Sequence, residues 1–233
     1  MSRYFAVIPA AGTGSRVGAT LPKQYLEVGQ RPLLYYAVAR FCNHPAIDRV
    51  CVILAPADRH FETYDWTVFG AKLEPLYVGG GSRAETVCNA LAALSGRVKD
   101  DDWILVHDAA RPCLSTQMLD RLIREVGEDR SGGLLAVRVA DTLKRSDEDC
   151  RSIRTESRDG LWQAQTPQMF PYDLLLRALQ SCDLGLITDE AAAIEALGLK
   201  PKLVQADATN LKVTHAQDLA LAELILNDAT GKK

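Results

Sequence analysis

Three stretches of the sequence combine glycine, cationic and acidic residues in a way that suits phosphate chemistry. The first follows an apolar run and reads Pro9-Ala-Ala-Gly-Thr-Gly-Ser-Arg16, and Pro22-Lys23 comes soon after it. Glycines let the backbone approach a phosphate closely and point its N–H groups at the phosphate oxygens. The cations Arg16 and Lys23 could neutralise the charge that develops as a phosphoryl bond breaks. A glycine-rich turn without a ligand is the alternative, but the density of small residues favours a phosphate site.

The first loop matches neither of the two common nucleotide-binding motifs. No Gly-Lys-Ser/Thr sequence closes it, so it is not a P-loop. Its third glycine, Gly18, stands one residue too late for the dinucleotide fingerprint. A triphosphate held by backbone groups and two cations is the ligand that this loop suits best.

Two more loops carry groups of the same kind. Gly79-Gly-Gly81 precedes Ser82-Arg-Ala-Glu-Thr86, which opens a predicted helix. Free N–H groups and hydroxyls at such a helix start could bind the polar edge of a ligand, although Ser82 could equally be a helix cap and nothing more. His107-Asp-Ala-Ala-Arg-Pro112 follows another apolar run, and its aspartate could hold Mg²⁺. Considered without the other two loops, Asp108 and Arg111 are better explained as a structural ion pair.

The elements that would position these loops alternate along the chain. Apolar, β-rich runs predict strands at Arg3–Pro9, Arg49–Ala55, Leu73–Val78, Trp103–Val106, Gly133–Val139 and Lys202–Gln205. Helical patterns cover Pro32–His44, Asp58–Phe69, Ser82–Leu94, Ser115–Val126, Tyr172–Cys182, Asp189–Leu197 and a last segment from about Ala216. This alternation predicts an α/β fold, with a mainly parallel sheet covered by helices on both faces. Loops that follow parallel strands converge on one crevice at the edge of the sheet, so we expect these three loops to form one site.

One stretch breaks the alternation. Asp141–Gly160 holds six acids and five bases with few large apolar residues, so it cannot be a core element of the sheet. The composition favours a solvated surface loop, and an arm that folds on a partner subunit is the sharper alternative.

Composition excludes several other classes of protein. The chain has 233 residues and a net charge of −3, which argues against a protein that coats nucleic acid. Its six cysteines form no Cys-x-x-Cys pair, and its four histidines show no metal-ligand spacing. The N-terminal apolar run is too short for a membrane span and lacks a signal-peptide cleavage pattern. We therefore expect a cytoplasmic protein that binds neither nucleic acid nor membranes.

Motifs along nearly the whole chain resemble those of one enzyme family. They are Pro9-Ala-Ala-Gly-x-Gly-x-Arg16, Pro22-Lys-Gln-Tyr25, His107-Asp-Ala-Ala-Arg-Pro112, Asp141-Thr142, Gly160-Leu-Trp162, Gln165-Thr-Pro-Gln168, Thr188-Asp-Glu-Ala191 and Asn210-Leu-Lys-Val-Thr214. Together they resemble the 2-C-methyl-D-erythritol 4-phosphate cytidylyltransferases of non-mevalonate isoprenoid synthesis. The resemblance implies a single Rossmann-like nucleotidyltransferase domain over residues 1–233. It also implies a homodimer built through a dimerisation arm at about residues 139–160, which replaces the surface-loop interpretation.

The resemblance also implies a reaction and its residues. CMP would pass from CTP to the polyol phosphate, with Mg²⁺ or another divalent cation as cofactor and Asp108 as its ligand. The implied catalytic residues are Arg16, Lys23, Arg158 and Lys212. The implied nucleotide-binding residues are Pro9, Ala10, Ala11, Gly12, Gly14, Gly80, Gly81, Ser82, Arg83 and Thr86. The implied substrate contacts are Asp108, Arg111, Thr142, Arg158, Thr188 and Lys212.

One departure from the family and two rival functions remain open. Gly81-Ser82 stands where the family has an acidic pair, which matters only if a side chain at this point contributes to base selectivity. A ribitol 5-phosphate or other sugar-phosphate cytidylyltransferase would share several of the motifs. A catalytically silent nucleotide-binding regulator would share the fold, since function resides in the site.

Overall fold

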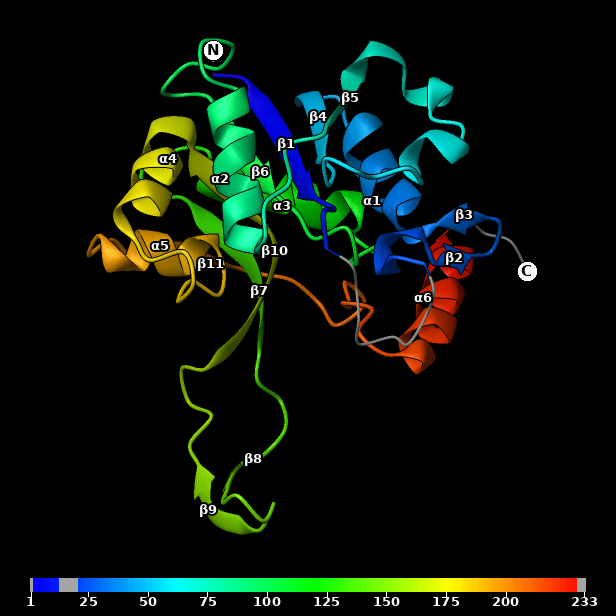
Figure 1. Ribbon diagram of the computed structural model, residues 1–233. Helices are drawn as coiled ribbons and strands as arrows, with labels where there is room; N and C mark the ends of the chain where they lie inside the picture. Colours follow the sequence, from blue (N-terminus) through cyan, green and yellow to red (C-terminus); the bar gives the residue numbers. More distant parts are fainter. Residues whose placement is uncertain (1, 13–20, 230–233) are drawn as a thin grey trace.

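A seven-stranded sheet forms the centre of the protein, in a computed structural model that describes residues 2–12 and 21–229 (Figure 1). The strands of this sheet are β1 (Tyr4–Pro9), β4 (Ile47–Ile53), β5 (Leu73–Leu76), β6 (Trp103–Val106), β7 (Gly133–Arg138), β10 (Trp162–Pro171) and β11 (Lys202–Gln205). Their order is β11-β7-β10-β6-β1-β4-β5. β10 is antiparallel to both of its neighbours, and the other pairs are parallel. The prediction of a mainly parallel sheet is therefore confirmed.

Helices cover both faces of the sheet, as predicted. The helices are α1 (Leu33–Cys42), α2 (Arg83–Ala93), α3 (Thr116–Val126), α4 (Tyr172–Ser181), α5 (Glu190–Ala196) and α6 (Ala216–Ala229). In β1, Phe5 and Val7 pack with α2, α4 and α5, whereas Ala6 and Ile8 pack with α1 and α3. Because successive side chains of a strand point to opposite faces, a strand buried on both faces must be apolar throughout. This is why β1 reads as a continuous apolar run.

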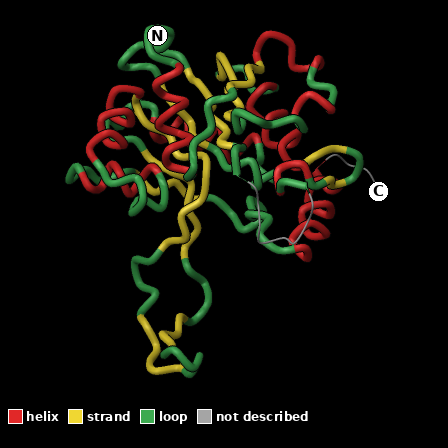
Figure 2. The backbone as a smooth tube through the Cα atoms, viewed as in Figure 1, coloured by secondary structure: helices red, strands yellow, loops and turns green. Residues whose placement is uncertain are grey.

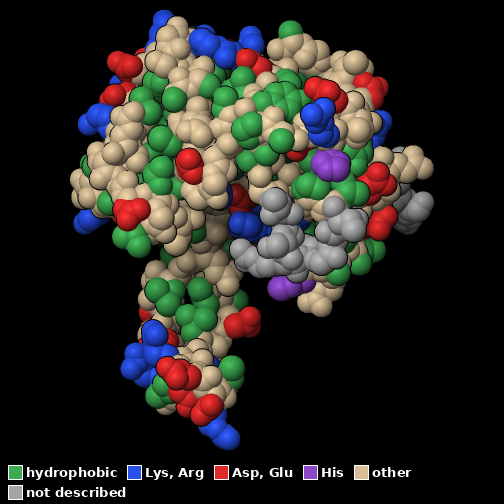
Figure 3. Space-filling view, viewed as in Figure 1, with side chains coloured by type: hydrophobic (Ala, Val, Ile, Leu, Met, Phe, Trp, Pro, Cys, Tyr) green, Lys and Arg blue, Asp and Glu red, His purple; other side chains and the backbone are tan. Residues whose placement is uncertain are grey.

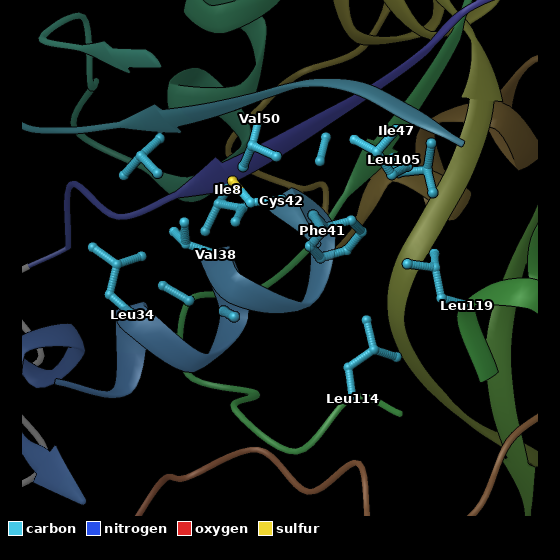
Figure 4. Packing of buried hydrophobic residues seen from close by; sticks show 14 of the residues in the cluster. Ile8, Leu34, Val38, Phe41, Cys42, Ile47, Val50, Leu105, Leu114 and Leu119 are labelled. Atoms are coloured by element: carbon cyan, nitrogen blue, oxygen red, sulfur yellow. The ribbon is translucent and has the colours of Figure 1, made fainter. Parts of the chain in front are cut away.

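The core beneath α1 shows the close packing of the second face. Phe41 and Val38 of α1 lie against Ile8 of β1 and Val50 of β4 (Figure 4). All four side chains are fully buried. This packing fixes the strands whose carboxyl ends carry the loops of interest.

In the described part of the chain, no helix is long and apolar enough to cross a membrane.

A small layer beside the sheet packs a hairpin from the first part of the chain against its last helix. The short hairpin of β2 (Glu27–Val28) and β3 (Arg31–Pro32) packs against α6. Val28, Val213 and Ala222 are buried together in this layer. It brings the segment before α6 beside the segment that follows the first loop.

The predicted helix at Asp58–Phe69 is wrong. The segment instead forms two 3-10 helices, η3 (Phe61–Thr63) and η4 (Thr67–Lys72). Asp58 and Asp65 accept hydrogen bonds from backbone N–H groups two or three residues ahead, which offers the backbone an alternative to helical bonding. Phe61 also stacks on Trp66, with ring centroids 4.5 Å apart.

The charged stretch forms an arm that leaves the body of the molecule (Figures 1 and 2). It begins after β7, returns into β10 and carries a hairpin of its own, β8 (Leu143–Ser146) and β9 (Ser152–Glu156). Acidic and basic side chains gather at its tip (Figure 3). There Glu156 forms ion pairs with Arg145 and Arg154. A hairpin with so few buried side chains gains little stability from its own packing.

Candidate active site

The three predicted loops meet at one cleft of about 470 Å³. They follow β1, β5 and β6, whose carboxyl ends lie at the same edge of the sheet because these strands run parallel. The predicted site residues that line this cleft are Pro9, Ala10, Ala11, Gly12, Lys23, Gly80, Gly81, Ser82, Arg83, Thr86, Asp108 and Lys212. Gln24, Ala109 and Ala110 also line it. The predicted convergence is confirmed for the described residues, whereas Gly14 and Arg16 lie outside them.

Glycine is required where the second loop passes the first. A Cβ atom on Gly79 would collide with the Ala11 side chain and would stand 2.7 Å from the Leu54 carbonyl oxygen. A Cβ atom on Gly80 would stand 2.5 Å from the Glu85 side chain. The two loops can therefore approach each other only because position 79 lacks a side chain, while Gly80 leaves room for Glu85 of its own segment.

The start of α2 holds the second loop through a reciprocal cap. Ser82 Oγ accepts a hydrogen bond from Glu85 N at 3.1 Å, and the Glu85 carboxylate accepts one from Gly81 N at 2.7 Å. Thr86 Oγ1 accepts a further bond from Gly80 N at 3.1 Å. The arrangement differs from a capping box only in that Glu85 binds the N–H of the residue before the N-cap, and it makes Ser82 the N-cap that the sequence suggested. Ser82 also lines the cleft, so both interpretations of this residue remain compatible.

Lys23 is held at the cleft by its neighbours in the chain. Buried Gln24 donates from Nε2 to the Ala10 carbonyl at 2.7 Å. The Tyr25 hydroxyl, which is also buried, donates to Asp58 at 2.9 Å. Two buried anchors thus follow Lys23 directly: Gln24 ties its short 3-10 turn to the first loop, and Tyr25 ties it to the segment after β4. Sequence reasoning missed Gln24, although it stands in the quoted Pro-Lys-Gln-Tyr motif.

Asp108 is surrounded by cations. Arg83 Nε donates to one carboxylate oxygen at 2.8 Å, and Lys212 Nζ lies 2.8 Å from the other. Arg111 Nε lies 3.8 Å from that second oxygen. Burial by itself would raise the pKa of Asp108, but Arg83, Lys212 and Arg111 outweigh it and hold the pKa well below its usual range. Asp108 is therefore ionised and ties residues from three distant segments together.

Arg83 has a second, buried partner that sequence reasoning missed. Glu190, at the start of α5 and 1% exposed, binds Arg83 Nη1 at 2.6 Å and Nη2 at 3.0 Å. Burial alone would lower the pKa of Arg83, but Glu190 and Asp108 raise it. The guanidinium is thus committed to two carboxylates, which makes a direct contact with the nucleotide less suitable for it. The motif Thr188-Asp-Glu-Ala was the signal that could have found Glu190.

The remaining predicted substrate contacts lie away from the cleft wall. Arg111 is buried behind Asp108 and donates to the Asn210 carbonyl at 2.7 Å. Thr188 is exposed just before α5. Thr142 and Arg158 are exposed on the arm, where Arg158 donates to the Ala140 carbonyl. Within the described part of this chain, the arm residues do not line the cleft of their own body.

The cleft fits a protein-held metal ion poorly. Among residues 2–12 and 21–229, no group of three His, Cys, Asp or Glu side chains could hold a metal. Asp108 is the one carboxylate among the described lining residues, and both of its oxygens already meet cations. Mg²⁺ prefers oxygen ligands and commonly binds through a few carboxylates and substrate phosphates. The surroundings of Asp108 therefore argue against the predicted metal role, which stays a prediction.

Comparison with known proteins gives a consistent result over the whole chain. The family model for IspD, 2-C-methyl-D-erythritol 4-phosphate cytidylyltransferase, matches residues 4–228. A curated relative from Nitrosospira multiformis with that name is 58% identical over 98% of this chain and 99% of its own length. One from Dechloromonas aromatica with the same name is also 58% identical, over 97% and 98%.

Solved structures are similar in fold and sequence. A structure described as 4-diphosphocytidyl-2C-methyl-D-erythritol synthase superposes with a TM-score of 0.86 at 42% identity, and covers 97% of this chain and 99% of its own. The Francisella tularensis 2-C-methyl-D-erythritol 4-phosphate cytidylyltransferase gives a TM-score of 0.81 at 32% identity, over 96% and 100%.

Proposed function

The chain belongs to the 2-C-methyl-D-erythritol 4-phosphate cytidylyltransferase family, and from this premise we propose how its residues divide the work of the reaction. The protein is a CTP-dependent cytidylyltransferase of non-mevalonate isoprenoid biosynthesis. One observation carries the proposal for the site. Lys23 and Lys212, far apart in sequence, line the same cleft as the two glycine loops.

The chemistry follows from the charges of the reactants. A phosphate oxygen of the acceptor attacks the α-phosphorus of CTP, and the bond to the β-phosphate breaks to release pyrophosphate. The attacking oxygen is already an anion at neutral pH, so no general base is needed. The enzyme's task is to align two anions and to screen their repulsion. Cations held at fixed positions in a cleft are suited to this task.

Each side of the cleft has a proposed role. Backbone groups of Ala10, Ala11, Gly80 and Gly81, with Thr86, surround the cytosine. Lys23 and Arg16 stabilise the charge on the α-phosphate. Lys212 binds the acceptor phosphate, and Asp108 holds Lys212 in place. Arg83 holds Asp108, and Glu190 in turn holds Arg83.

We propose that the divalent cation enters the site with CTP. Triphosphate oxygens can supply most of the ligands that Mg²⁺ requires. When bound, the ion would neutralise part of the charge on the triphosphate. The lack of a carboxylate cage among the described residues favours this arrangement over an ion that resides in the free protein.

We further propose a homodimer in which each arm reaches the partner's cleft. The arm carries Thr142 and Arg158, two predicted substrate contacts that do not line the cleft of their own body. An arm that leaves the body and buries few side chains suits a role at a second subunit (Figure 1). The six cysteines are unpaired, which favours a reducing compartment, and we propose that the enzyme works in the cytoplasm.

Nucleotide selectivity tests the proposed base pocket. We expect kcat/KM for CTP to exceed that for UTP, ATP and GTP by roughly 10²-fold or more, because polar groups matched to one base edge are left unpaired by another base. Small residues and the close approach of Gly79 to Ala11 also leave little room for a purine. The measurement is pyrophosphate release with each nucleotide at a fixed concentration of methylerythritol phosphate.

The same assay separates the proposal from its rival within the class. Ribitol 5-phosphate replaces methylerythritol phosphate at a fixed concentration of CTP, and we expect little pyrophosphate. A preference for ribitol 5-phosphate would reassign the acceptor.

In the nucleotide comparison, similar specificity constants for CTP and UTP would show that the glycine and serine at positions 81 and 82 have relaxed the base selectivity of the pocket.

A further inference from the structure

Three polar residues beside the cleft have no part in the proposed roles. His107 and Asn210 are fully buried, and Thr166 is 4% exposed. They belong to three separate segments: the loop after β6, the strand β10 and the segment before α6. Buried polar groups normally have hydrogen-bond partners, and the partners of these three residues lie on the segments that carry Asp108 and Lys212.

The directions of their hydrogen bonds can be assigned. His107 Nε2 lies 3.0 Å from the Arg111 carbonyl oxygen, which can only accept, so Nε2 carries a hydrogen. Thr166 Oγ1 already accepts a hydrogen bond from Asp108 N, which leaves its own hydrogen for His107 Nδ1. Nδ1 is then an acceptor. Thr166 Oγ1, 3.0 Å away, must donate to it.

The same hydroxyl also holds the backbone of Asp108. Asp108 N donates to Thr166 Oγ1 at 3.0 Å. The order is thus Asp108 N–H to the Thr166 hydroxyl, the Thr166 hydroxyl to His107, and His107 to the Arg111 carbonyl. The Thr166 hydroxyl thus binds one end of the segment 108–111, at Asp108 N, and the His107 imidazole binds the other end, at the Arg111 carbonyl. The Asp108 carboxylate therefore faces the cleft from a backbone that cannot easily rotate.

A second set of bonds fixes the backbone around Lys212. Asn210 Nδ2 donates to the Thr166 carbonyl at 2.8 Å, and the Asn210 carbonyl accepts from Arg111 at 2.7 Å. Val213 N donates to the Ala110 carbonyl at 2.9 Å. Hydrogen bonds therefore hold the backbone on both sides of Lys212, through Asn210 before it and through Val213 after it. The Lys212 side chain is about half exposed, yet its amine lies 2.8 Å from the Asp108 carboxylate.

Thr166 joins these two sets. Its hydroxyl binds Asp108 and its carbonyl binds the segment of Lys212. The residue lies where the pairing of β10 with β7 shifts register, between Ala164 and Gln168, so its polar groups are free of the strand ladder.

We propose that Thr166, acting through Asp108 and His107, is a positioning residue for cytidylyl transfer. It sets the relative position of Asp108 and Lys212 from beneath the cleft and touches neither substrate. The proposal rests on the assigned reaction, because the effect is measured on its turnover. An interaction that merely stabilised the fold would alter the melting temperature without separating turnover from CTP binding.

The test compares Thr166→Val, which removes the hydroxyl at nearly constant shape, with Thr166→Ser, which keeps it. We expect Thr166→Val to lower kcat by about tenfold or more, since small displacements of reacting groups are costly, while KM for CTP changes by less than about threefold. Thr166→Ser should restore kcat to within about threefold of wild type. Thr63→Val, which also loses a hydroxyl hydrogen bond, serves as the matched control outside the cleft.

A second measurement does not depend on activity. In the full-length protein labelled with ¹⁵N-histidine, we expect the His107 Nδ1 resonance, assigned with a His107→Asn variant, to move in Thr166→Val and to stay in Thr166→Ser. Wild-type kcat in Thr166→Val, a parallel loss of kcat and CTP affinity, or an unmoved Nδ1 resonance would overturn the proposal. A wild-type protein without activity would instead overturn the assigned reaction, and the resonance would still decide whether Thr166 holds His107.

Discussion

Lys23→Ala is expected to lower turnover by about 10²-fold or more while the protein folds normally. That is the scale seen when one preorganised group that stabilises the transition state is removed. Lys23 lies on the cleft wall on a short turn that Gln24 and Tyr25 anchor, so the substitution removes a charge and leaves the anchors intact. CTP binding should weaken less than turnover, because the glycine loops continue to hold the nucleotide.

The measurement is steady-state pyrophosphate release together with CTP affinity by calorimetry. Lys200→Ala is the matched control, because Lys200 is an exposed lysine in the loop before β11. Its loss should leave both quantities unchanged. Near-wild-type turnover in Lys23→Ala would remove this lysine from the mechanism.

Arg158→Ala is expected to abolish most activity in a homodimer and yet to complement Lys23→Ala in a mixed dimer. If the arm acts on the partner, one of the two sites in the mixed dimer combines an intact body with an intact arm. The other site carries both defects. Such a dimer should recover about half of wild-type activity, because each site is assembled from both chains.

The mixed dimer is purified with two different affinity tags, and its composition is confirmed by mass spectrometry. The control is a mixed dimer of Lys23→Ala chains with Lys212→Ala chains, in which each chain has one substitution in its body and an intact arm. In that mixture every site keeps one defect, so activity should stay low. Failure of the Lys23 and Arg158 pair to recover activity would show that the arm serves its own body, and would leave the cytidylyltransferase assignment in place.

Local patterns predicted the sheet and its loops well. β6, the middle of β1 and residues 50–53 of β4 are buried on both faces, and their apolar runs are visible in the sequence because none of these positions can be polar. The glycine at 79 could be recognised for a similar reason, since it stands where a side chain would collide with a neighbouring segment. In these cases the physical constraint acts on each residue alone.

Pairings between distant residues could not be predicted in the same way. Arg83 and Glu190 are 107 positions apart, and only the fold brings the guanidinium to the buried carboxylate. The predicted nucleotide contact of Arg83 stays a prediction, and the sequence did not show that two carboxylates hold its guanidinium. The predicted substrate contact of Arg111 also stays a prediction, and the sequence did not show that this side chain is buried beside Asp108.

Local competition explains the wrong helix at Asp58–Phe69. Helical spacing of apolar residues was present, but Asp58 and Asp65 bind the backbone ahead of them, and Trp66 stacks on Phe61. The strand β10 was missed for a different reason. Its first three residues, next to the arm, are not buried, and it becomes buried only where it enters the sheet, so its start resembles a loop.

The most direct test of the central claim is ³¹P NMR of the wild-type protein with CTP, methylerythritol phosphate and Mg²⁺. A direct displacement predicts that the phosphomonoester signal of the acceptor disappears as two diphosphate signals of a CDP-linked product appear, with one pyrophosphate for each product molecule. Omission of the acceptor should leave CTP intact. Accumulation of CMP with an unchanged acceptor signal, or no reaction at all with folded protein, would contradict the account.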